Sequence, residues 1–493
     1  MLTLINTNRM QPPIAPVGLE YVASAAKATG LEVDILDLCL ADDPIKALRD
    51  YFAACAPRLV GLSFRNIDDC FWPSAQWFVP DLAETVRIIR TMTEAPIVIG
   101  GIGFSIFAKR IVEYTGADFG VLGDGEVAIV SLYNELQGAG RLDCVKGLIY
   151  SVEGGIVANP PAWPMLPSLP PRRNLFDNIT YFRKGGQIGF ETKRGCNRLC
   201  IYCADPLGKG TLLRLRAPAE VADEVEALLS QGIDVLHTCD AEFNIPHQHA
   251  MAVCQEFIGR GLGERVRWYA YLSVVPFDSD LAAAMRKAGC VGINFTTDAA
   301  CPDMLKTYRQ PYTKEAIASA VRLCRANCMA AMTDLLLGGP GETPETLSET
   351  LAFMKQVGPD CVGCGVGVRV YPETEMARIV EAEGDPAGNP SIRRRYNGHV
   401  DFFQPTFYIS RHLGPHPARL VKDLIAGDRR FFEPMEELPS GPSGHADSKD
   451  HNYNDNTELV AAIAAGARGA YWHILIGAYA QIRHPTARPP RRA

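Results

Sequence analysis

The stretch TKRGCNRLCIYCADP, from Thr192 to Pro206, places Cys196, Cys200 and Cys203 within eight positions. It follows a predicted strand at Gln187–Thr192, so the three thiols fall on the loop after that strand. Fifteen cysteines scattered at random over 493 residues would give this spacing only about 0.014 times. The grouping therefore indicates a site and not a coincidence of composition.

From Gln187 to about Pro372, the chain alternates apolar, strand-like runs with helical patterns. This alternation predicts parallel βα units, and six of them favour a partial (β/α)6 barrel over a complete barrel of eight. The loop cysteines would then lie at the carboxyl ends of the strands, where barrels of this kind carry their chemistry. The six strands are expected at Gln187–Thr192, Val235–Thr238, Val266–Leu272, Val291–Phe295, Ala331–Leu337 and Gly365–Val370.

The N-terminal part alternates in the same way and predicts a doubly wound, flavodoxin-like parallel sheet, so the chain as a whole belongs to the α/β class. Ligands of such sheets bind beyond the carboxyl ends of the strands. The strands are expected at Leu2–Asn6, Glu32–Leu36, Leu59–Phe64, Pro96–Gly100 and Phe119–Leu122. The helices are expected near Val17–Thr29, Pro44–Ala56, Asp81–Thr93, Ile106–Tyr114 and Ala128–Leu136.

Glycine-rich segments follow the last two of these N-terminal strands, and a polar segment, SFRNIDD, follows the third. Glycine lets a backbone approach a ligand closely, so successive glycine-bearing strand ends predict a site for a large cofactor. The residues concerned are Arg65, Asn66, Asp68, Gly100, Gly101, Gly103, Gly123, Gly125 and Glu126.

The domain boundaries follow from changes in composition. We expect an N-terminal domain at 1–145, a hairpin and proline-rich linker at 146–186, the barrel at 187–383, and a smaller, mainly helical C-terminal region at 384–493 that covers the substrate. The polar stretch PSGPSGHADSKDHNYNDNT predicts a mobile loop, after which Asn456 or Thr457 could cap a helix. The final RHPTARPPRRA is expected to be a disordered basic tail.

Composition excludes several classes of protein. The chain has 47% hydrophobic and 21% charged residues with a net charge of -7, which gives no electrostatic footprint for nucleic acid. The start MLTLINTN lacks the pattern of a signal peptide, and the apolar stretch Leu459–Tyr479 carries Arg468 and His473, so we expect a packed helix and no membrane span. The many cysteines then indicate a reducing compartment, and we expect the protein in the cytoplasm.

Three clustered thiolates suit an iron–sulfur cluster whose fourth iron is left without a protein ligand. A four-iron cluster normally takes four cysteines, so the open iron would bind a small molecule. Zinc is usually closed by four Cys or His ligands, and no histidine lies within thirty residues of the triplet. The spacing therefore predicts a [4Fe–4S] cluster at Cys196, Cys200 and Cys203.

The C-x3-C-x2-C motif, with Tyr202 before its last cysteine, resembles that of the radical S-adenosylmethionine (SAM) superfamily. The segments HTCDAEFN, NFTTDAACPDMLKTYRQPYT, DLLLGGPGETPET and GVRVYPETEMA resemble later strand ends of that family's barrel. The resemblance implies that SAM is contacted by Asp240, Glu242, Thr296, Thr297, Asp298, Gly338 and Gly339. It also implies that Arg369 and Tyr371 line the catalytic pocket, although both could simply close the barrel.

The N-terminal half, with PPIAPVGLEYVASAAKATGLEVDILDL and VLGDGE, resembles the cobalamin-binding domain of the B12-dependent subgroup. Many such domains ligate cobalt through a histidine in D-x-H-x-x-G, but this chain has no histidine before His237, which we expect to be a core residue. The resemblance therefore implies a weakly ligated cobalt. Its lower face would be open, lie near Arg65, Asn66 or Asp68, or be touched by water.

The resemblance implies a cobalamin-dependent radical SAM C-methyltransferase. A 5′-deoxyadenosyl radical would abstract hydrogen from an unactivated carbon, and methylcobalamin would supply the methyl group. An external electron donor such as ferredoxin or flavodoxin would reduce the cluster. The substrate stays open: it could be a peptide or protein residue, a lipid, or a natural-product precursor. TKRGCNRLCIYCADPLGKG faintly resembles enzymes that C-methylate a glutamine of methyl-coenzyme M reductase.

Three other functions stay as alternatives. A cobalamin-bearing radical SAM cyclase or rearrangement enzyme would use the same cofactors without methyl transfer. A methylthiotransferase is disfavoured, because Cys39, Cys55 and Cys70 lie too close together for its second cluster. A sensor that binds cobalamin or an iron–sulfur cluster would not cleave SAM.

Overall fold

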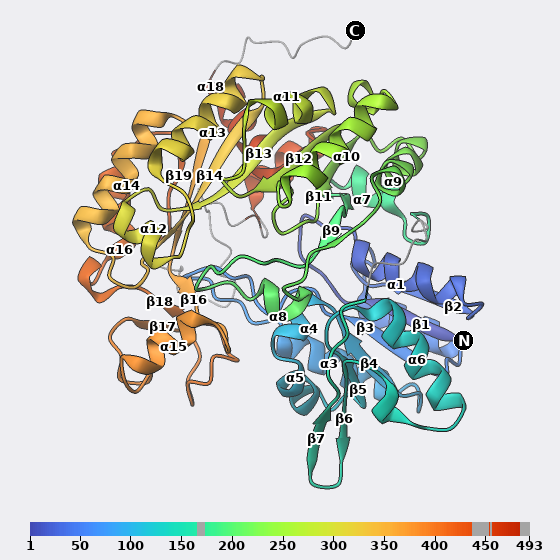
Figure 1. The fold of residues 1–493 in the computed structure, drawn as a ribbon. Coiled ribbons are helices and arrows are strands. Elements are labelled where there is room, and N and C mark those ends of the chain that lie inside the picture. The colour runs from blue at the N-terminus through green and yellow to red at the C-terminus, as the bar shows by residue number, and fades with distance from the viewer. Residues whose placement is uncertain (165–172, 436–452, 454–455, 484–493) are drawn as a thin grey trace.

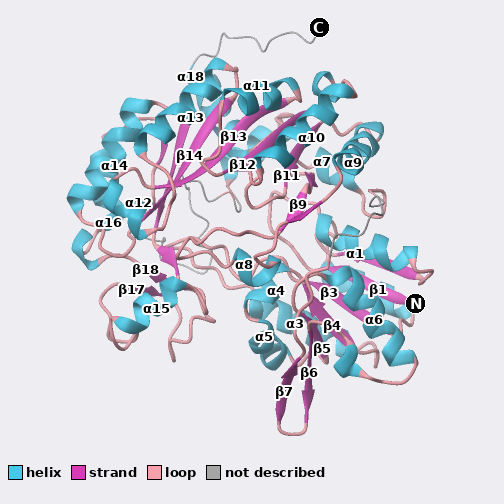
Figure 2. Cartoon of the chain, viewed as in Figure 1, coloured by secondary structure: helices cyan, strands magenta, loops and turns pink. Residues whose placement is uncertain are grey.

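The computed structural model describes residues 1–164, 173–435, 453 and 456–483. Two parallel sheets, each covered by helices, make up most of the molecule, and a small antiparallel sheet lies beside them (Figures 1 and 2). Within the described residues, no helix is both long and apolar enough to cross a membrane. The α/β class predicted from the sequence is confirmed.

The N-terminal sheet has the strand order β2-β1-β3-β4-β5-β6-β7, and its first five strands are parallel. This is the flavodoxin-like order, with β1 between β2 and β3. Leu2 of β1 lies opposite both Val33 and Leu59, and all five residues of β1 are buried because apolar clusters cover both faces of the sheet. The strands are β1 (Leu2–Asn6), β2 (Val33–Asp37), β3 (Leu59–Ser63), β4 (Ile97–Gly100), β5 (Phe119–Val121), β6 (Leu148–Val152) and β7 (Gly155–Ala158). The helices are α1 (Val17–Ala28), α2 (Pro44–Ala54), α3 (Val79–Arg90), α4 (Ile102–Ile106), α5 (Ala108–Thr115) and α6 (Gly125–Gln137).

The hairpin β6–β7 differs from its expected place in the linker. It pairs antiparallel with β5 and so extends the N-terminal sheet, projecting from it at the lower edge of Figure 1. The prediction did not anticipate that the edge of β5 needs a hydrogen-bonding partner.

The second sheet is an open half-barrel of parallel strands in the order β19-β15-β14-β13-β12-β11-β8. Helices cover its outer face (Figure 2) and bury the largest apolar cluster. Its strands are β8 (Gly189–Phe190), β11 (Val235–Thr238), β12 (Arg267–Leu272), β13 (Cys290–Asp298), β14 (Ala330–Leu337), β15 (Cys361–Val366) and β19 (Phe431–Phe432). Its helices are α9 (Pro218–Ser230), α10 (His247–Gly259), α11 (Ser279–Lys287), α12 (Pro302–Thr307), α13 (Lys314–Ala326), α14 (Pro344–Val357) and α16 (Pro417–Ile425).

Local sequence fixes where these helices begin and end. Asp43, at the N-terminus of α2, accepts a hydrogen bond from the Lys46 amide, and Pro44 supplies a first helical residue that needs no amide hydrogen. In α14, Thr343 and Thr346 form a capping box, and Gly358 ends the helix with left-handed backbone angles.

Smaller elements complete the chain around the half-barrel. An antiparallel sheet, β16-β18-β17, follows the sixth strand, and helices α17 and α18 pack on the inner face of the half-barrel against Tyr269 and Met332. Asn456 caps α17 as predicted, whereas most of the predicted polar loop and all but the first residue of the basic tail lie outside the described residues. These elements are α7 (Asn178–Arg183), β9 (Lys193–Arg194), α8 (Asp205–Lys209), β10 (Arg214–Leu215), β16 (Val368–Arg369), α15 (Glu375–Ala382), β17 (Ile392–Arg394), β18 (Thr406–Tyr408), α17 (Thr457–Ala464) and α18 (Tyr471–Arg483).

Candidate functional site

A cavity of about 590 Å³ lies where the carboxyl ends of the two parallel sheets meet. From the N-terminal sheet it is lined by residues at the ends of β1, β3, β4 and β5, among them Asn6, Ser63 and Gly100. From the half-barrel it is lined by the end of β11 and by Tyr271 of β12. Both folds bind ligands at this end of their strands, so the cavity is the expected place for a cofactor shared by the two domains.

The predicted cofactor residues divide into two groups. Seven line this cavity: Arg65, Gly100, Gly101, Gly123, Gly125, Glu126 and Asp240. Nine lie outside its lining: Asn66, Asp68, Gly103, Glu242, Thr296, Thr297, Asp298, Gly338 and Gly339. The first group is mainly the set predicted to hold cobalamin, and the second is mainly the set predicted to contact SAM.

Two glycines leave room in the cavity for a large ligand. A Cβ atom added to Gly18 would meet nothing within 4 Å, and one added to Gly100 would meet nothing closer than 3.9 Å. At Gly101 and Gly123 the same atom would instead lie 2.6 Å from the Phe64 carbonyl oxygen and 2.8 Å from the Trp163 ring. Gly18 and Gly100 thus form an open cradle in the cavity wall that leaves space for a ligand, whereas Gly101 and Gly123 are required by packing.

Arg65 lies in the cavity, where it is accessible to solvent yet surrounded by protein groups that include Cys239, Tyr271 and Tyr471. Desolvation of the guanidinium inside the cavity lowers the pKa of Arg65 below its ordinary value, and it outweighs the opposite effect of these three groups. Its Nη1 donates to Asn66 Oδ1 over 2.8 Å. Arg65 is therefore the predicted lower-face residue that the structure places in the cavity, while Asn66 and Asp68 lie outside its lining.

His237 is buried as predicted, but it also lines the cavity, which the sequence did not indicate. Its ring stacks on Tyr269 with a centroid distance of 5.2 Å. Burial lowers the pKa of His237 to about 4, so the ring is neutral at neutral pH.

The cysteine loop is held by its backbone. The amide of Cys196 donates to Gly210 O over 3.0 Å, and Cys203 donates to Cys200 O over 3.3 Å. Gly195 has a positive φ of 91°, and a Cβ atom there would lie 2.1 Å from the Leu212 carbonyl oxygen. Glycine at this position therefore lets the loop turn back closely enough to bring its thiols together.

The three thiols interact electrostatically, and burial raises the pKa of each, that of Cys200 to about 12. Across the described residues, no three His, Cys, Asp or Glu side chains converge closely enough to hold a single metal ion. A structural zinc ion usually takes four Cys or His ligands, whereas a four-iron cluster distributes its thiolates over separate irons. The assignment of Cys196, Cys200 and Cys203 as cluster ligands stays a prediction.

Glu242 lies beside the cysteine loop and has an unused acceptor. Its Oε1 accepts from Thr296 Oγ1 over 2.9 Å, whereas its buried Oε2 has no hydrogen-bond partner within the described part of the chain. Burial raises the pKa of Glu242 to about 7. A buried carboxylate oxygen without a partner fits a cationic or hydroxyl donor, such as the amino group of SAM.

Asp240 is engaged within the protein. Its carboxylate accepts hydrogen bonds from the amide and hydroxyl of Thr192, over 2.9 and 2.6 Å, and from the amide of Lys193. These bonds fix the start of the cysteine loop. The predicted contact between Asp240 and SAM stays a prediction.

The other predicted SAM contacts also have partners inside the protein. Thr297 Oγ1 donates to the Asp334 carbonyl over 2.8 Å, and the Gly338 amide donates to the buried Glu342. Asp298 accepts from Tyr202 and Gln310. These contacts support the framework around the cysteine loop and leave the proposed SAM contacts untested.

Arg369 and Tyr371, predicted as catalytic residues, do not line the cavity. Arg369 Nε donates to Asp68 over 2.9 Å, and its guanidinium lies 4.6 Å from the centre of the Tyr371 ring. The Tyr371 hydroxyl lies 3.6 Å from Cys70 Sγ. These contacts join the N-terminal domain to β16 and favour a structural role, so the catalytic role stays a prediction.

One wall of the cavity is ionic. Arg194 pairs with Glu126 over 2.7 Å and with Glu191 over 2.8 Å. Burial would raise the pKa of Glu126, but Arg194 outweighs it and holds this pKa below its ordinary value. This pairing stabilises the charges of both the carboxylate and the guanidinium in a buried wall.

Sequence reasoning missed several lining residues, including Gly18, Arg194, Lys209 and Tyr271. Gly18 lies in PPIAPVGLE, a segment that resembles the cobalamin-binding domain but has no individual residue predicted as a ligand contact. Arg194 lies in the cysteine stretch TKRGCNRLCIYCADP. Their functional placement depends on contacts between domains, which local patterns do not encode.

Comparison with known proteins agrees with this geometry. Residues 190–354 match the model of the radical SAM superfamily, and residues 4–133 match the B12 binding domain. The solved structure of the radical S-adenosylmethionine methyltransferase TsrM from Kitasatospora setae, with tryptophan substrate and a SAM analog bound, is 31% identical and has a TM-score of 0.90. The similarity covers 98% of both chains. The chain belongs to the radical SAM superfamily.

In this radical SAM protein, the match to the B12 binding domain precedes the barrel. The chain is 29% identical to the tryptophan 2-C-methyltransferase of Streptomyces laurentii, over 96% of this chain and 95% of that protein. The cobalamin-dependent enzyme OxsB, at 17% identity and a TM-score of 0.69 over 83% of this chain and 64% of that one, shares the fold.

These comparisons confirm the predicted class, a cobalamin-dependent radical SAM methyltransferase. They also confirm the predicted family cofactors, since structures of TsrM contain cobalamin, a [4Fe-4S] cluster and a SAM analog. They do not confirm the resemblance to enzymes that methylate a glutamine of methyl-coenzyme M reductase.

Proposed function

We propose that this protein transfers a methyl group to a carbon atom of tryptophan or of a closely related indole compound. The single observation that carries this proposal is the cavity at the carboxyl ends of both sheets, bordered by Arg65 on one side and by Tyr271 on the other. A site shared by the B12 binding domain and the radical SAM barrel suits methyl transfer from cobalamin to a substrate in the barrel.

The likeness to the tryptophan methyltransferases supports an indole substrate because it extends through the whole chain. The C-terminal region, which we expected to cover the substrate, is included in the 98% of the chain that aligns with TsrM. Tyr271 adds a physical reason, since this residue keeps 36% of its surface exposed although it lines an internal cavity. An exposed aromatic ring inside a cavity offers a stacking partner for an indole.

The residues present fit the family's cofactors. Cys196, Cys200 and Cys203 would hold the cluster, Glu242 would accept a hydrogen bond from the SAM amino group, and the cradle at Gly18 and Gly100 would admit cobalamin. When bound, these groups supply methyl-transfer and radical chemistry. The chain itself contributes position and exclusion of water, through the buried strand ends and the inner helices α17 and α18.

The carbon that accepts the methyl group decides whether a radical is needed. An indole C2 is an aromatic carbon, from which hydrogen can leave as a proton after the methyl group has been added. An unactivated sp3 carbon instead requires hydrogen abstraction by a 5′-deoxyadenosyl radical, as we predicted from the sequence. The partnerless Glu242 oxygen beside the cysteine loop supports SAM at the cluster and keeps this second mechanism as a candidate.

Anaerobic reconstitution tests the indole substrate and distinguishes the two mechanisms. The purified chain is loaded with iron, sulfide and cobalamin. It is then incubated with tryptophan, SAM carrying a deuterated methyl group, and a low-potential chemical reductant that supplies electrons to the cobalamin and the cluster. We expect labelled methyltryptophan by mass spectrometry, with the methyl group located by NMR. Formation of 5′-deoxyadenosine in step with product would favour the radical mechanism.

Other outcomes identify the alternatives. Methylation of a peptide or natural-product precursor with none of tryptophan would overturn the indole proposal while keeping the class. Turnover of SAM with a product of unchanged mass would indicate a cyclase or rearrangement enzyme. Binding of both cofactors without any turnover would indicate a sensor.

A further inference from the structure

A polar chain of four side chains leads from the bulged end of β13 to one of the cluster cysteines. The Tyr202 hydroxyl donates to both oxygens of Asp298, over 2.8 and 2.7 Å. Gln310 Nε2 donates to Asp298 and also to Cys200 Sγ, which lies 3.4 Å away. Nothing in the proposed reaction uses Gln310.

The backbone holds the four hydrogen-bonded side chains in place. Asp298 has a positive φ of 57°, at a shift in the register between β13 and β14, and it is buried. A non-glycine residue with such a φ requires support from its surroundings, and here its side chain is turned toward Tyr202 and Gln310. Pro311 follows Gln310 and disfavours helical angles there, which ends the turn after α12.

Asp298 also fixes which end of the Gln310 amide faces the cysteine. A glutamine amide carries two N–H donors on nitrogen and only acceptors on oxygen. Both oxygens of Asp298 accept from the Tyr202 hydroxyl, and the Gln310 nitrogen donates to Asp298, so its second hydrogen remains for Cys200. With the amide reversed, its oxygen would face both the carboxylate and the thiolate.

We propose that Gln310 is a positioning residue that donates an N–H···S hydrogen bond to the Cys200 thiolate and thereby raises the reduction potential of the cluster. This inference rests on the proposed function, since it requires a cluster on the three cysteines. Reduction adds one electron to the cluster and increases the negative charge on its sulfur atoms. A hydrogen bond to sulfur stabilises that charge, and such bonds are among the features that set cluster potentials.

The test is a potentiometric titration of the reconstituted protein, in which a low-potential chemical reductant gives the cluster one electron and is itself oxidised. The variant Gln310→Leu removes the donor at similar volume. We expect its one-electron reduction equilibrium to fall about tenfold, which is 59 mV. Gln310→Glu, which presents oxygen in place of the N–H group, should shift the potential in the same direction.

Gln255→Leu is the matched control, because Gln255 is exposed on α10. It should leave the potential unchanged. Iron and sulfide content and the Mössbauer spectrum of each protein establish that a cubane cluster is present before potentials are compared. A wild-type chain without such a cluster overturns the proposed function and this inference together.

A second measurement does not depend on a variant that folds. Pulsed EPR of the reduced wild-type cluster, with glutamine side chains labelled with nitrogen-15, should show a weak coupling to one labelled nitrogen. An intact cluster with no such coupling, or with an unshifted potential in Gln310→Leu, overturns the inference and leaves the proposed function standing.

Discussion

Gly18 lies at the second position of α1, where the helix faces the cavity. Because a Cβ atom at this position would meet nothing within 4 Å, Gly18→Leu should fold normally, and a better helix former should slightly favour the helix. The leucine side chain would instead occupy the cradle. We expect the affinity for cobalamin to fall by about tenfold or more, corresponding to roughly 1.4 kcal/mol, as measured by equilibrium dialysis.

Gly259→Leu is the control for this substitution. Gly259 is also a helical glycine with nothing within 4 Å of its Cβ position, but it is exposed on α10, away from the cavity lining. If both variants bound cobalamin as the wild type does, the cradle would not be the cobalamin site.

His237 predicts a dependence of stability on pH. Its pKa is about 4 in the folded protein and 6.5 ordinarily, so between these values the unfolded chain binds a proton that the folded chain does not. The free energy of unfolding should therefore decrease as the pH falls from about 6.5 to 4, by up to about 3 kcal/mol.

Urea unfolding of the cofactor-free protein at several pH values measures this effect. His237→Gln should remove most of the loss, because glutamine stays neutral over the whole range. His399→Gln, at an exposed histidine, should keep the wild-type dependence. An unchanged pH dependence in His237→Gln would show that other groups cause the acid sensitivity.

Strands were predicted well where an uncharged, largely apolar run is bounded by turn signals. Val235–Thr238 has the predicted bounds, and β1 does as well, because strands of a sheet covered on both faces are rich in apolar residues. The sixth barrel strand was placed too late, at Gly365–Val370, since CVGCGV in Cys361–Val366 is poor in typical strand formers. The two residues of β19, Phe431–Phe432, are too few to show any period.

Helix boundaries and the site could not be predicted where they depend on contacts with distant parts of the chain. The helix expected at Ile106–Tyr114 corresponds to α5, and the short helix α4 before it was not predicted. The break between the two helices is at Phe107, which packs against Phe403 from a distant part of the chain. The cysteine loop could be predicted because its ligands are local in sequence. The cavity could only be placed at strand ends, because its lining combines side chains from both domains.

Helix α17 depends on a cap that the sequence did indicate. The Asn456 side chain accepts a hydrogen bond from the Leu459 amide over 2.9 Å. Asn456→Ala should therefore destabilise the helix by about 1 kcal/mol, while Asn456→Asp should retain the bond. Hydrogen exchange measures this, since the amides of Thr457–Ala464 should exchange faster in the alanine variant alone. Equal exchange in all three proteins would show that packing against the half-barrel, and not the cap, holds α17.

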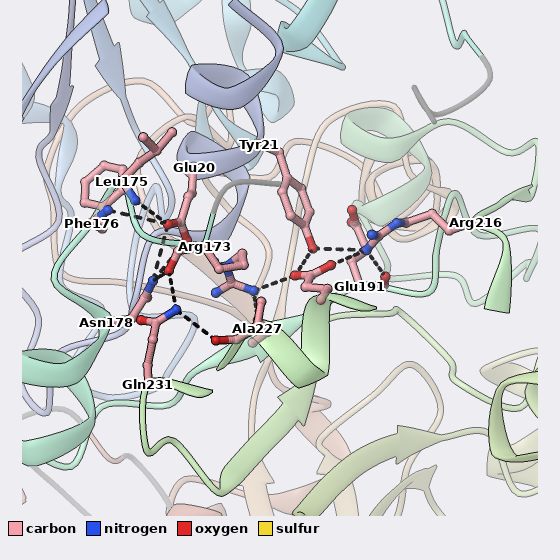
Figure 3. A network of polar contacts seen from close by, with 12 residues as sticks. Glu20, Tyr21, Arg173, Leu175, Phe176, Asn178, Glu191, Arg216, Ala227 and Gln231 are labelled. Atoms are coloured by element: carbon pink, nitrogen blue, oxygen red, sulfur yellow. Dashed lines mark hydrogen bonds and ion pairs between the residues drawn. The ribbon is translucent and has the colours of Figure 1, made fainter. Parts of the chain in front are cut away.

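The two domains are joined by buried charges that lie far apart in the sequence. Arg173 pairs with Glu20 of α1 over 2.7 Å and with Glu224 of α9 over 2.5 Å, and Glu224 also pairs with Arg216 (Figure 3). The Tyr21 hydroxyl donates to the same carboxylate over 2.8 Å. Since the cavity lies between these domains, this network sets how far apart its two walls are.

Glu224 pairs with two arginines, and its side chain is fully buried. Glu224→Gln would leave Arg173 with only Glu20 and would leave Arg216 without its buried ion-pair partner. Removing one partner of a buried pair typically costs about 3–5 kcal/mol, so we expect a loss of this size in the free energy of unfolding. Cobalamin affinity should fall with it, because the N-terminal sheet would no longer be held against the half-barrel.

Asp223→Asn is the matched control for Glu224→Gln. Asp223 is the preceding residue on α9 and also pairs with an arginine, Arg260, but its side chain is 53% exposed. An exposed pair contributes about 0–1 kcal/mol, so this variant should unfold and bind cobalamin almost as the wild type does. Two neighbouring acid-to-amide changes thus compare a buried ion pair with an exposed one, in which Arg260 also keeps Glu226 and Glu256. If both variants lost equally little stability, the buried network would be dispensable, and the apolar contacts between the domains would have to hold the cavity open by themselves.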